Sequence, residues 1–191
     1  RLGWAHLDSG ALYRALTLAA LDNLGEEGKR KGAAWSGQRM VALAEELPVR
    51  LVLVGDQFRP EAAGVDVEKA IRSERVTRHV SVAEAIPEVR AWVNARQREA
   101  AAAHPSGVVV DGRDIGTVVF PDADLKVFLS ASPEERARRR YWEIRSKGLK
   151  VELEDIRAAE EARDQRDAQR VHSPMQVAED AIVVDTTGKS A

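Results

Sequence analysis

The chain has 191 residues, 44% of them hydrophobic, which suits one compact domain or one core that carries a smaller inserted lobe. Its 29 lysines and arginines nearly balance 31 aspartates and glutamates, which argues against a nucleic-acid coat protein or a polybasic membrane binder. The absence of cysteine excludes disulfides and thiolate zinc sites, and no apolar run is long enough to span a bilayer, so we expect a cytoplasmic protein.

The first residues predict a strand, a helix and a linker, in that order. Residues 4–8 favour a short strand, and Asp8 or Ser9 can cap the helix that follows. Gly25 ends this helix, and the polar, glycine-bearing residues 26–38 favour a linker. The helix itself is indicated by apolar residues at helical spacing, namely Leu12, Ala15, Leu16 and Ala19.

The middle of the chain predicts a hairpin between helices. Residues 39–47 have a helical pattern, whereas residues 49–54 alternate as a strand does. The alternation breaks at Gly55 and Asp56, which indicates a hairpin turn. Residues 66–103 are helical by pattern, with Pro87 in the first turn of a second helix.

Three apolar runs do not alternate, which is typical of strands buried on both faces of a parallel sheet. They are residues 107–112, 125–129 and 181–185. Between the last two, Ser132 and Pro133 start a helix, and Glu135 can complete a capping box. This alternation of strands and helices predicts an α/β fold with a parallel sheet.

Ligands of an open parallel sheet bind beyond the carboxyl ends of its strands. That rule directs attention to residues 8–10, to residues 111–114 and to Asp185. In Asp111-Gly112-Arg113-Asp114 a core strand ends in two aspartates that flank an arginine. Spacing alone favours a binding site and a local ion-pair network that closes a glycine turn about equally.

Arginines form the other candidate cluster. Within a helix over residues 152–170, Arg163, Arg166 and Arg170 share one face with Asp167 beside them, and guanidinium groups suit bidentate phosphate contacts. Spacing alone nevertheless favours a solvated, ion-paired helix for this cluster. It favours the same for Arg14 and for the run Arg136, Arg138, Arg139 and Arg140.

The histidines offer no catalytic centre, because His6, His104 and His172 are far apart in the sequence and lack metal-ligand spacing. No nucleophile–base arrangement is present either. Arginines and aspartates without a nucleophile are typical of phosphoryl transfer, in which positioning and charge neutralisation do most of the catalysis.

Five segments resemble bacterial cytidylate kinases, in order along essentially the whole chain. They are residues 7–14 (LDSGALYR), 87–90 (PEVR), 96–98 (RQR), 111–123 (DGRDIGTVVFPDA) and 163–167 (RDQRD). The thirteen-residue run from Asp111 is highly specific. The resemblance implies phosphorylation of CMP and dCMP by ATP with Mg²⁺, no nucleic-acid polymer or membrane as partner, and a monomer when the protein is complete.

The resemblance also implies a P-loop kinase fold, a three-layer parallel-sheet core with an enlarged lobe for the nucleoside monophosphate (NMP) and a helical lid. The insert in that lobe contains a small antiparallel sheet, which matches the hairpin signal near residues 49–65. The implied divisions are an incomplete core of residues 1–30, 104–135 and 171–191, an NMP lobe of residues 31–103, and a lid with its adjoining helix over residues 136–170.

Roles carry over by position. Ser81, Arg90 and Asp114 resemble the groups that read cytosine, because a carboxylate accepts from the N4 amine and arginine donates to the N3/O2 edge. The resemblance further implies that the phosphate is held by Arg14, Arg113 and Arg170, with Ser9 nearby, and that the sugar is reached by Arg163 and Asp167. It implies a catalytic role for Arg113, Asp111 and Arg163, and an approach of Asp111 to Mg²⁺ through water.

One feature of the family is missing from the sequence. Its GxxxxGK[ST] loop, whose amides and lysine hold the ATP phosphates, does not occur, so no residue is assigned to ATP. Gly188-Lys189-Ser190 is a chance match that lacks the earlier glycine. We expect an incomplete kinase chain that is inactive by itself. The alternative is a relative that has lost catalysis and binds nucleotides or regulates; a kinase for another small acceptor is disfavoured.

Overall fold

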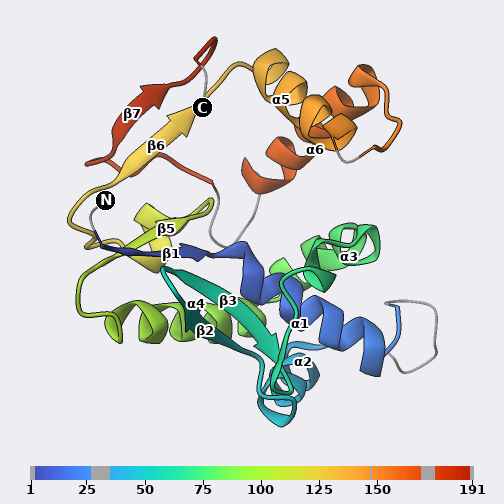
Figure 1. Ribbon diagram of the computed structural model, residues 1–191, viewed down its shortest axis with the longest axis vertical. Coiled ribbons are helices and arrows are strands. Elements are labelled where there is room, and N and C mark those ends of the chain that lie inside the picture. The colour runs from blue at the N-terminus through green and yellow to red at the C-terminus, as the bar shows by residue number, and fades with distance from the viewer. Residues whose placement is uncertain (1–2, 27–34, 147, 169–174, 190–191) are drawn as a thin grey trace. The chain divides into compact units, whose positions relative to one another are not determined.

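A computed structural model describes residues 3–26, 35–146, 148–168 and 175–189 (Figure 1). The chain has a mixed α/β fold and divides into two compact units, Arg1–Ile115 and Gly116–Ala191. Each unit is described by itself below. In the part of the chain that the structure describes, no helix is both long and apolar enough to cross a membrane.

The first unit contains a mixed five-stranded sheet. Its central strand β1 (Ala5–Asp8) is parallel to β5 (Val108–Asp111) on one side and to β3 (Gln57–Ala62) on the other. The antiparallel strands β2 (Arg50–Val54) and β4 (Val65–Asp66) both pair with β3. The register places Asp8 opposite Asp111, so the carboxyl ends of two neighbouring strands each carry an aspartate.

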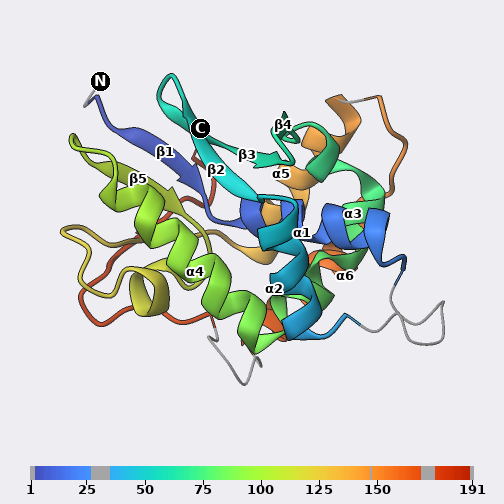
Figure 2. The same cartoon turned by 90° about the horizontal axis from the view of Figure 1, so that it is seen from below.

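The helices of this unit pack beside the sheet and against one another (Figure 2). Their main core cluster contains buried apolar residues such as Leu12, Leu16, Val76, Val89 and Val93. On the sheet itself, Ala100 packs against Leu7 and Phe58. The helices are α1 (Gly10–Asn23), α2 (Gly37–Glu46), the short 3₁₀ helix η1 (Ala70–Arg72), α3 (Glu74–Glu84) and α4 (Pro87–Ala102).

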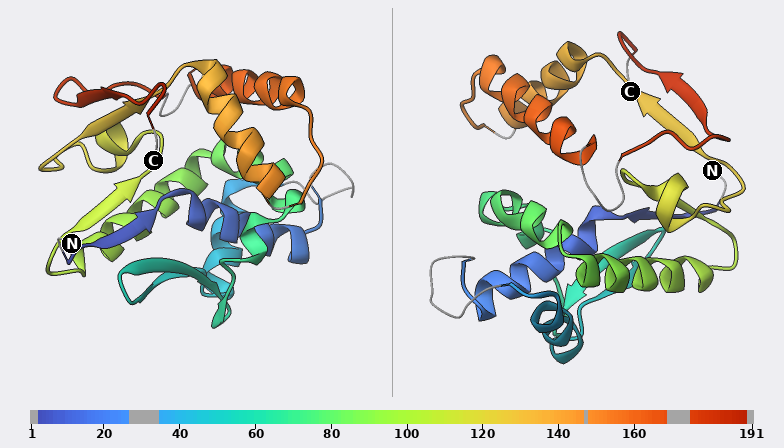
Figure 3. Two further views of the ribbon diagram at one scale, coloured as in Figure 1. Left: turned by 45° about the horizontal axis from the view of Figure 1, so that its top comes forward. Right: turned by 180° about the vertical axis from the view of Figure 1, so that it is seen from behind.

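The second unit contains a two-stranded parallel sheet and two helices. The strands are β6 (Val127–Ser130) and β7 (Ile182–Asp185), and the helices are α5 (Pro133–Ser146) and α6 (Leu153–Ala168). The helices α5 and α6 lie side by side (Figure 3). An ion pair between Arg136 and Asp164 joins them. A π-helical turn, η2 (Ile115–Val119), lies where the two units meet in the sequence.

Several predicted elements are confirmed. The hairpin forms between β2 and β3, where Val54 pairs with Gln57 and Gly55 has a φ of +64°. Asp8, not Ser9, caps α1, because Asp8 Oδ1 accepts from the Gly10 amide at 2.9 Å. Ser132 caps α5 by accepting from the Glu135 amide at 3.2 Å. Most of the predicted linker, at residues 27–34, lies outside the described residues.

Two details of the capping and helix predictions are wrong. The helical pattern from residue 66 starts too early, because β4 pairs with β3 there and Ser73 caps α3 by accepting from the Val76 amide at 3.4 Å. Glu135 does not reach back in a capping box. Its carboxylate accepts instead from Arg138 at 2.6 Å and Arg139 at 2.9 Å, which lie three and four residues further along the same helix.

The expectation that the apolar strands are buried on both faces is also wrong. Successive side chains of a strand point to opposite faces. In β5, Val108 and Val110 pack against the core, whereas Val109 is 49% exposed. Leu129 of β6 and Ile182 of β7 are likewise exposed. Within its own unit each sheet therefore has an open side, although the strands pair in parallel as predicted.

Candidate substrate site

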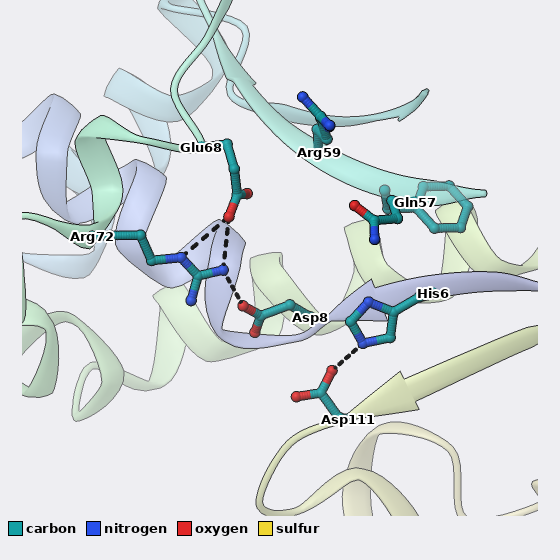
Figure 4. Close-up of a pocket in the computed structure, with 8 residues that line it drawn as sticks. His6, Asp8, Gln57, Arg59, Glu68, Arg72 and Asp111 are labelled. Carbon is teal, nitrogen blue, oxygen red and sulfur yellow. Dashed lines mark hydrogen bonds and ion pairs between the residues drawn. The ribbon is translucent and has the colours of Figure 1, made fainter. Parts of the chain in front are cut away.

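The carboxyl ends of β1 and β5 form one side of a polar cavity of about 270 Å³ (Figure 4). Because side chains alternate along β1, Leu7 is buried in the core while His6 and Asp8 point into the cavity. Asp111 enters from β5, and Arg72 lies opposite Asp8. Charged side chains from several elements thus meet where a parallel sheet binds its ligands.

Asp8 has two partners. One carboxylate oxygen caps α1, and the other accepts from Arg72 Nη2 at 2.6 Å. Arg72 also donates to Glu68 at 2.9 Å, so it bridges two carboxylates. Partial burial lowers the pKa of the Arg72 guanidinium, but its bonds to Glu68 and Asp8 outweigh that effect, and the net pKa is raised. Asp8 therefore stabilises the start of α1 and, through Arg72, also holds η1 beside the end of β1.

Asp111 pairs with His6, whose Nε2 lies 2.7 Å from Asp111 Oδ1. Sequence spacing did not indicate this pair, because only the parallel register of β1 and β5 brings the two residues together across 105 residues of sequence. The Asp111 side chain is 64% exposed. Among the described residues, no three His, Asp or Glu side chains cluster as a metal site.

Arg90 and Asp114 form the most buried ion pair of the site. Their side chains are 7% and 12% exposed, and Arg90 Nη2 donates to Asp114 Oδ2. Arg90 comes from α4, stands 5.7 Å from the centre of the Tyr13 ring, and also donates to the Glu84 carbonyl at 3.3 Å. Its Nε is buried with no acceptor in the described part of the chain. An ion pair taken out of water is held only by good geometry.

Arg14 extends from α1 toward the neighbouring helices. Its Nη1 donates to Thr77 Oγ1 at 3.0 Å and to the Ile71 carbonyl at 3.4 Å. Arg113 follows β5 and is half-buried. Ser9 is buried at the β1–α1 turn, and its amide donates to the Asp111 carbonyl at 3.1 Å. Of the sequence-predicted residues, Ser9 and Asp111 are thus in contact at the ends of β1 and β5, whereas Arg14 contacts η1 and α3.

The comparison with known proteins decides the family. A family profile described as cytidylate kinase matches residues 1–191. The chain belongs to the cytidylate kinase family. It is 46% identical over 188 residues to the cytidylate kinases of Streptococcus pneumoniae strains Hungary19A-6 and D39, and 45% identical to that of strain TIGR4. Each match covers 97% of this chain and 80% of the relative.

This membership makes the chain a nucleoside-monophosphate kinase, and nucleotide substrates and the use of ATP follow from it. The predicted cytosine readers lie on α3, on α4 and in the loop after β5, all in the first unit. Arg90 and Asp114 are in contact, and Ser81 is a half-buried residue of α3. The structure does not bring Ser81 into a described contact with either of them.

The remaining predicted residues of this cytidylate kinase belong to the second unit. Arg163 is exposed on α6. The side chain of Asp167 and the whole of Arg170 lie outside the described residues. At the end of β7, a hydrogen bond from the Thr187 hydroxyl, followed by one from its amide, lowers the pKa of Asp185. The Asp185 carboxylate therefore accepts hydrogen bonds from the turn that directly follows β7.

Sequence reasoning missed three residues around the site. His6 precedes Asp8 by two positions, which places both on one face of a strand and was a usable signal. Gln97 lies seven residues after Arg90 and so shares its face of α4. Arg72 carried no signal, because only the fold brings it to Asp8 across 64 residues.

Proposed function

We propose that this protein phosphorylates CMP and dCMP to CDP and dCDP with ATP, and that the residues around β1 and β5 bind the CMP. The observation that carries the proposal is the buried Arg90–Asp114 pair. A buried carboxylate and guanidinium present an acceptor beside donors in a water-poor place. Cytosine presents the complementary pattern, the N4 amine beside the N3 and O2 acceptors.

The pair also supports a preference for cytosine over uracil. Asp114 can accept from an N4 amine, but it gains nothing from the O4 oxygen of uracil. Arg90 has donors to spare, since its Nε has no acceptor among the described residues. A site built to hydrogen-bond one group rejects an analogue that lacks it, because its buried polar atoms are then left unpaired.

The phosphate contacts are proposed from charge and position. Arg14 follows Ser9 by five residues on α1, Arg113 follows β5 directly, and guanidinium groups bind phosphate through charge-assisted bonds. We include Arg170 in this clamp, and Arg163 and Asp167 at the sugar, on the family resemblance. In the reaction, Arg113 and Arg163 would stabilise the charge on the transferred phosphoryl group.

Asp111 fits the proposed magnesium role. Mg²⁺ keeps several waters and takes one or two carboxylates together with substrate phosphates, so one exposed carboxylate suffices on the protein side. The ion would neutralise charge on the phosphates. His6 would hold the Asp111 carboxylate in place through its 2.7 Å contact. No residue is assigned to the ATP phosphates, because the sequence contains no GxxxxGK[ST] loop.

The finer architecture belongs to the same proposal. We assign the fold to the P-loop kinases, with residues 31–103 as the NMP lobe and residues 136–170 as the lid and its adjoining helix. The antiparallel pairing of β2, β3 and β4 supports the antiparallel part of an NMP insert, although β3 also pairs with β1 of the core. The protein is proposed to act in the cytoplasm, as a monomer when complete.

Replacement of Arg113 tests the phosphate role. We expect Arg113→Ala to weaken CMP binding by about 10- to 150-fold, because one charged hydrogen-bonding partner of a phosphate contributes ~1.5–3 kcal/mol. Cytidine, which has no phosphate, should bind almost as it does to the unaltered chain. Isothermal titration calorimetry with both ligands measures the two dissociation constants.

Arg75→Ala is the matched control for that experiment, because Arg75 pairs with Asp22 on the first unit away from β1 and β5. It should change neither dissociation constant. Equal losses of CMP and cytidine affinity in Arg113→Ala would contradict a phosphate role and indicate a structural one.

A further inference from the structure

Gln97 is a buried polar residue to which the proposed function gives no role. It is 1% exposed, in the third turn of α4, whose buried residues also include Val89 and Val93. Its Nε2 donates to the Ser9 carbonyl at 2.7 Å, a contact that joins residues 88 positions apart. Its Oε1 is buried with no hydrogen-bond partner in the described part of the chain.

Packing alone does not account for this side chain. A buried amide without full hydrogen bonding costs about 1–3 kcal/mol, whereas an apolar side chain of similar volume would fill the space without that cost. The orientation of the amide is fixed, because a carbonyl oxygen only accepts and the NH₂ group must therefore face Ser9. The Gln97 side chain therefore holds one backbone carbonyl, that of Ser9, in a defined position.

That carbonyl belongs to a turn that is tightly linked to the substrate loop. The Ser9 amide donates to Asp111, so Ser9 is held on one side by β5 and on the other by Gln97. Ser9 also lies against Gly112, where a Cβ atom would stand only 2.1 Å from Ser9 Oγ. A shift of the Ser9 turn would therefore displace the loop that carries Arg113 and Asp114.

We propose that Gln97 is a positioning residue of the CMP site, which fixes the Ser9 turn and through it the loop of Arg113 and Asp114. This inference rests on the proposed function. Gln97 touches no substrate atom in this scheme. It acts by holding the groups proposed at the phosphate in one geometry. Displacement of such groups by about 1 Å can lower a reaction rate by on the order of a hundredfold.

The test compares CMP with cytidine in two replacements of Gln97 and one control. Gln97→Met keeps the volume and removes the hydrogen bond. We expect it to lower the ratio of CMP affinity to cytidine affinity by about tenfold. Val93→Ala, a buried change one turn earlier on α4, destabilises the same helix without touching Ser9, and it should leave the ratio unchanged.

Gln97→Glu supplies a second readout. Burial raises the pKa of an introduced carboxyl group, and its protonated form can donate to the Ser9 carbonyl as the amide does. The affinity ratio should therefore be near that of the unaltered chain at low pH and fall as the pH rises through that pKa. Two results would overturn the proposal. One is a CMP-to-cytidine affinity ratio in Gln97→Met within about twofold of that of the unaltered chain. The other is a ratio in Gln97→Glu that equals that of the unaltered chain at every pH.

The design separates this inference from the function on which it rests. If the unaltered chain binds CMP no more tightly than cytidine, the proposed phosphate site fails before any variant is compared. If Gln97→Met does not unfold cooperatively in urea, the pH series of Gln97→Glu decides the outcome, because its low-pH form keeps the donor. Titration calorimetry on the 191-residue chain gives the affinities, and urea unfolding of the same samples gives the folded state of each variant.

Discussion

Replacement of Asp114 by alanine should both destabilise the protein and abolish much of its preference for CMP over UMP. Removing the carboxylate leaves the Arg90 guanidinium buried and unpaired, which costs ~3–5 kcal/mol. It also removes the acceptor for the N4 amine, and a good bidentate base contact contributes about 1–3 kcal/mol of discrimination. The CMP/UMP affinity ratio should fall by about 5- to 150-fold. Urea unfolding and calorimetry with both nucleotides measure the two effects.

Asp114→Asn sharpens this test because it changes hydrogen bonding at nearly constant shape. The amide can donate to the O4 oxygen of uracil, so the CMP/UMP ratio should fall further than in the alanine variant while the folded state loses less stability. Glu74→Ala is a matched control, since it removes the partner of Arg78 from an exposed pair that contributes at most about 1 kcal/mol. An unchanged ratio in both Asp114 variants would show that Asp114 does not read the base.

Local signals in the sequence predicted the elements well and the burial of the strands poorly. The Gly55-Asp56 break and the Ser132 cap are chemical features of a few neighbouring residues, and the structure contains both the hairpin and the capped helix. The apolar run at Val108–Asp111 predicted a parallel strand correctly. It could not show that Val109 faces an open side, because exposure depends on which elements cover each face of the sheet.

The site was predictable only in part, for the same physical reason. Asp111, Arg113 and Asp114 stand together in the sequence and at the end of a strand, where chemistry was expected. Their partners come from elsewhere, His6 from β1 and Arg90 from α4. Whether a charged residue is paired or solvated is set by such long-range contacts, so spacing alone could not decide between an ion-pair network and a binding site.

Replacement of Gly112 by alanine should impair both folding and binding. The added Cβ would stand 2.1 Å from Ser9 Oγ and 2.8 Å from the Ile115 side chain, and because Ser9 is buried we expect the loop and the Ser9 turn to move apart. Overpacking of this kind costs ~1–3 kcal/mol. Because the displaced loop carries Arg113, loss of one charged phosphate contact of ~1.5–3 kcal/mol should lower CMP affinity by about 10- to 150-fold.

A second substitution tests the cause of that loss. Ser9→Ala in the Gly112→Ala background removes the hydroxyl with which the new methyl group collides, so it should restore part of the lost free energy of unfolding, although Ser9→Ala alone stabilises nothing. A non-additive double-mutant cycle of this kind shows that the two positions are coupled. Gly116→Ala is the control, because the nearest atom to its Cβ would be a side-chain carbon of Lys126 at 3.2 Å, well beyond the 2.1 Å at Gly112. Additive effects of the two substitutions would mean that Ser9 and Gly112 are not in contact, and the link from the β1–α1 turn to the substrate loop would fail with them.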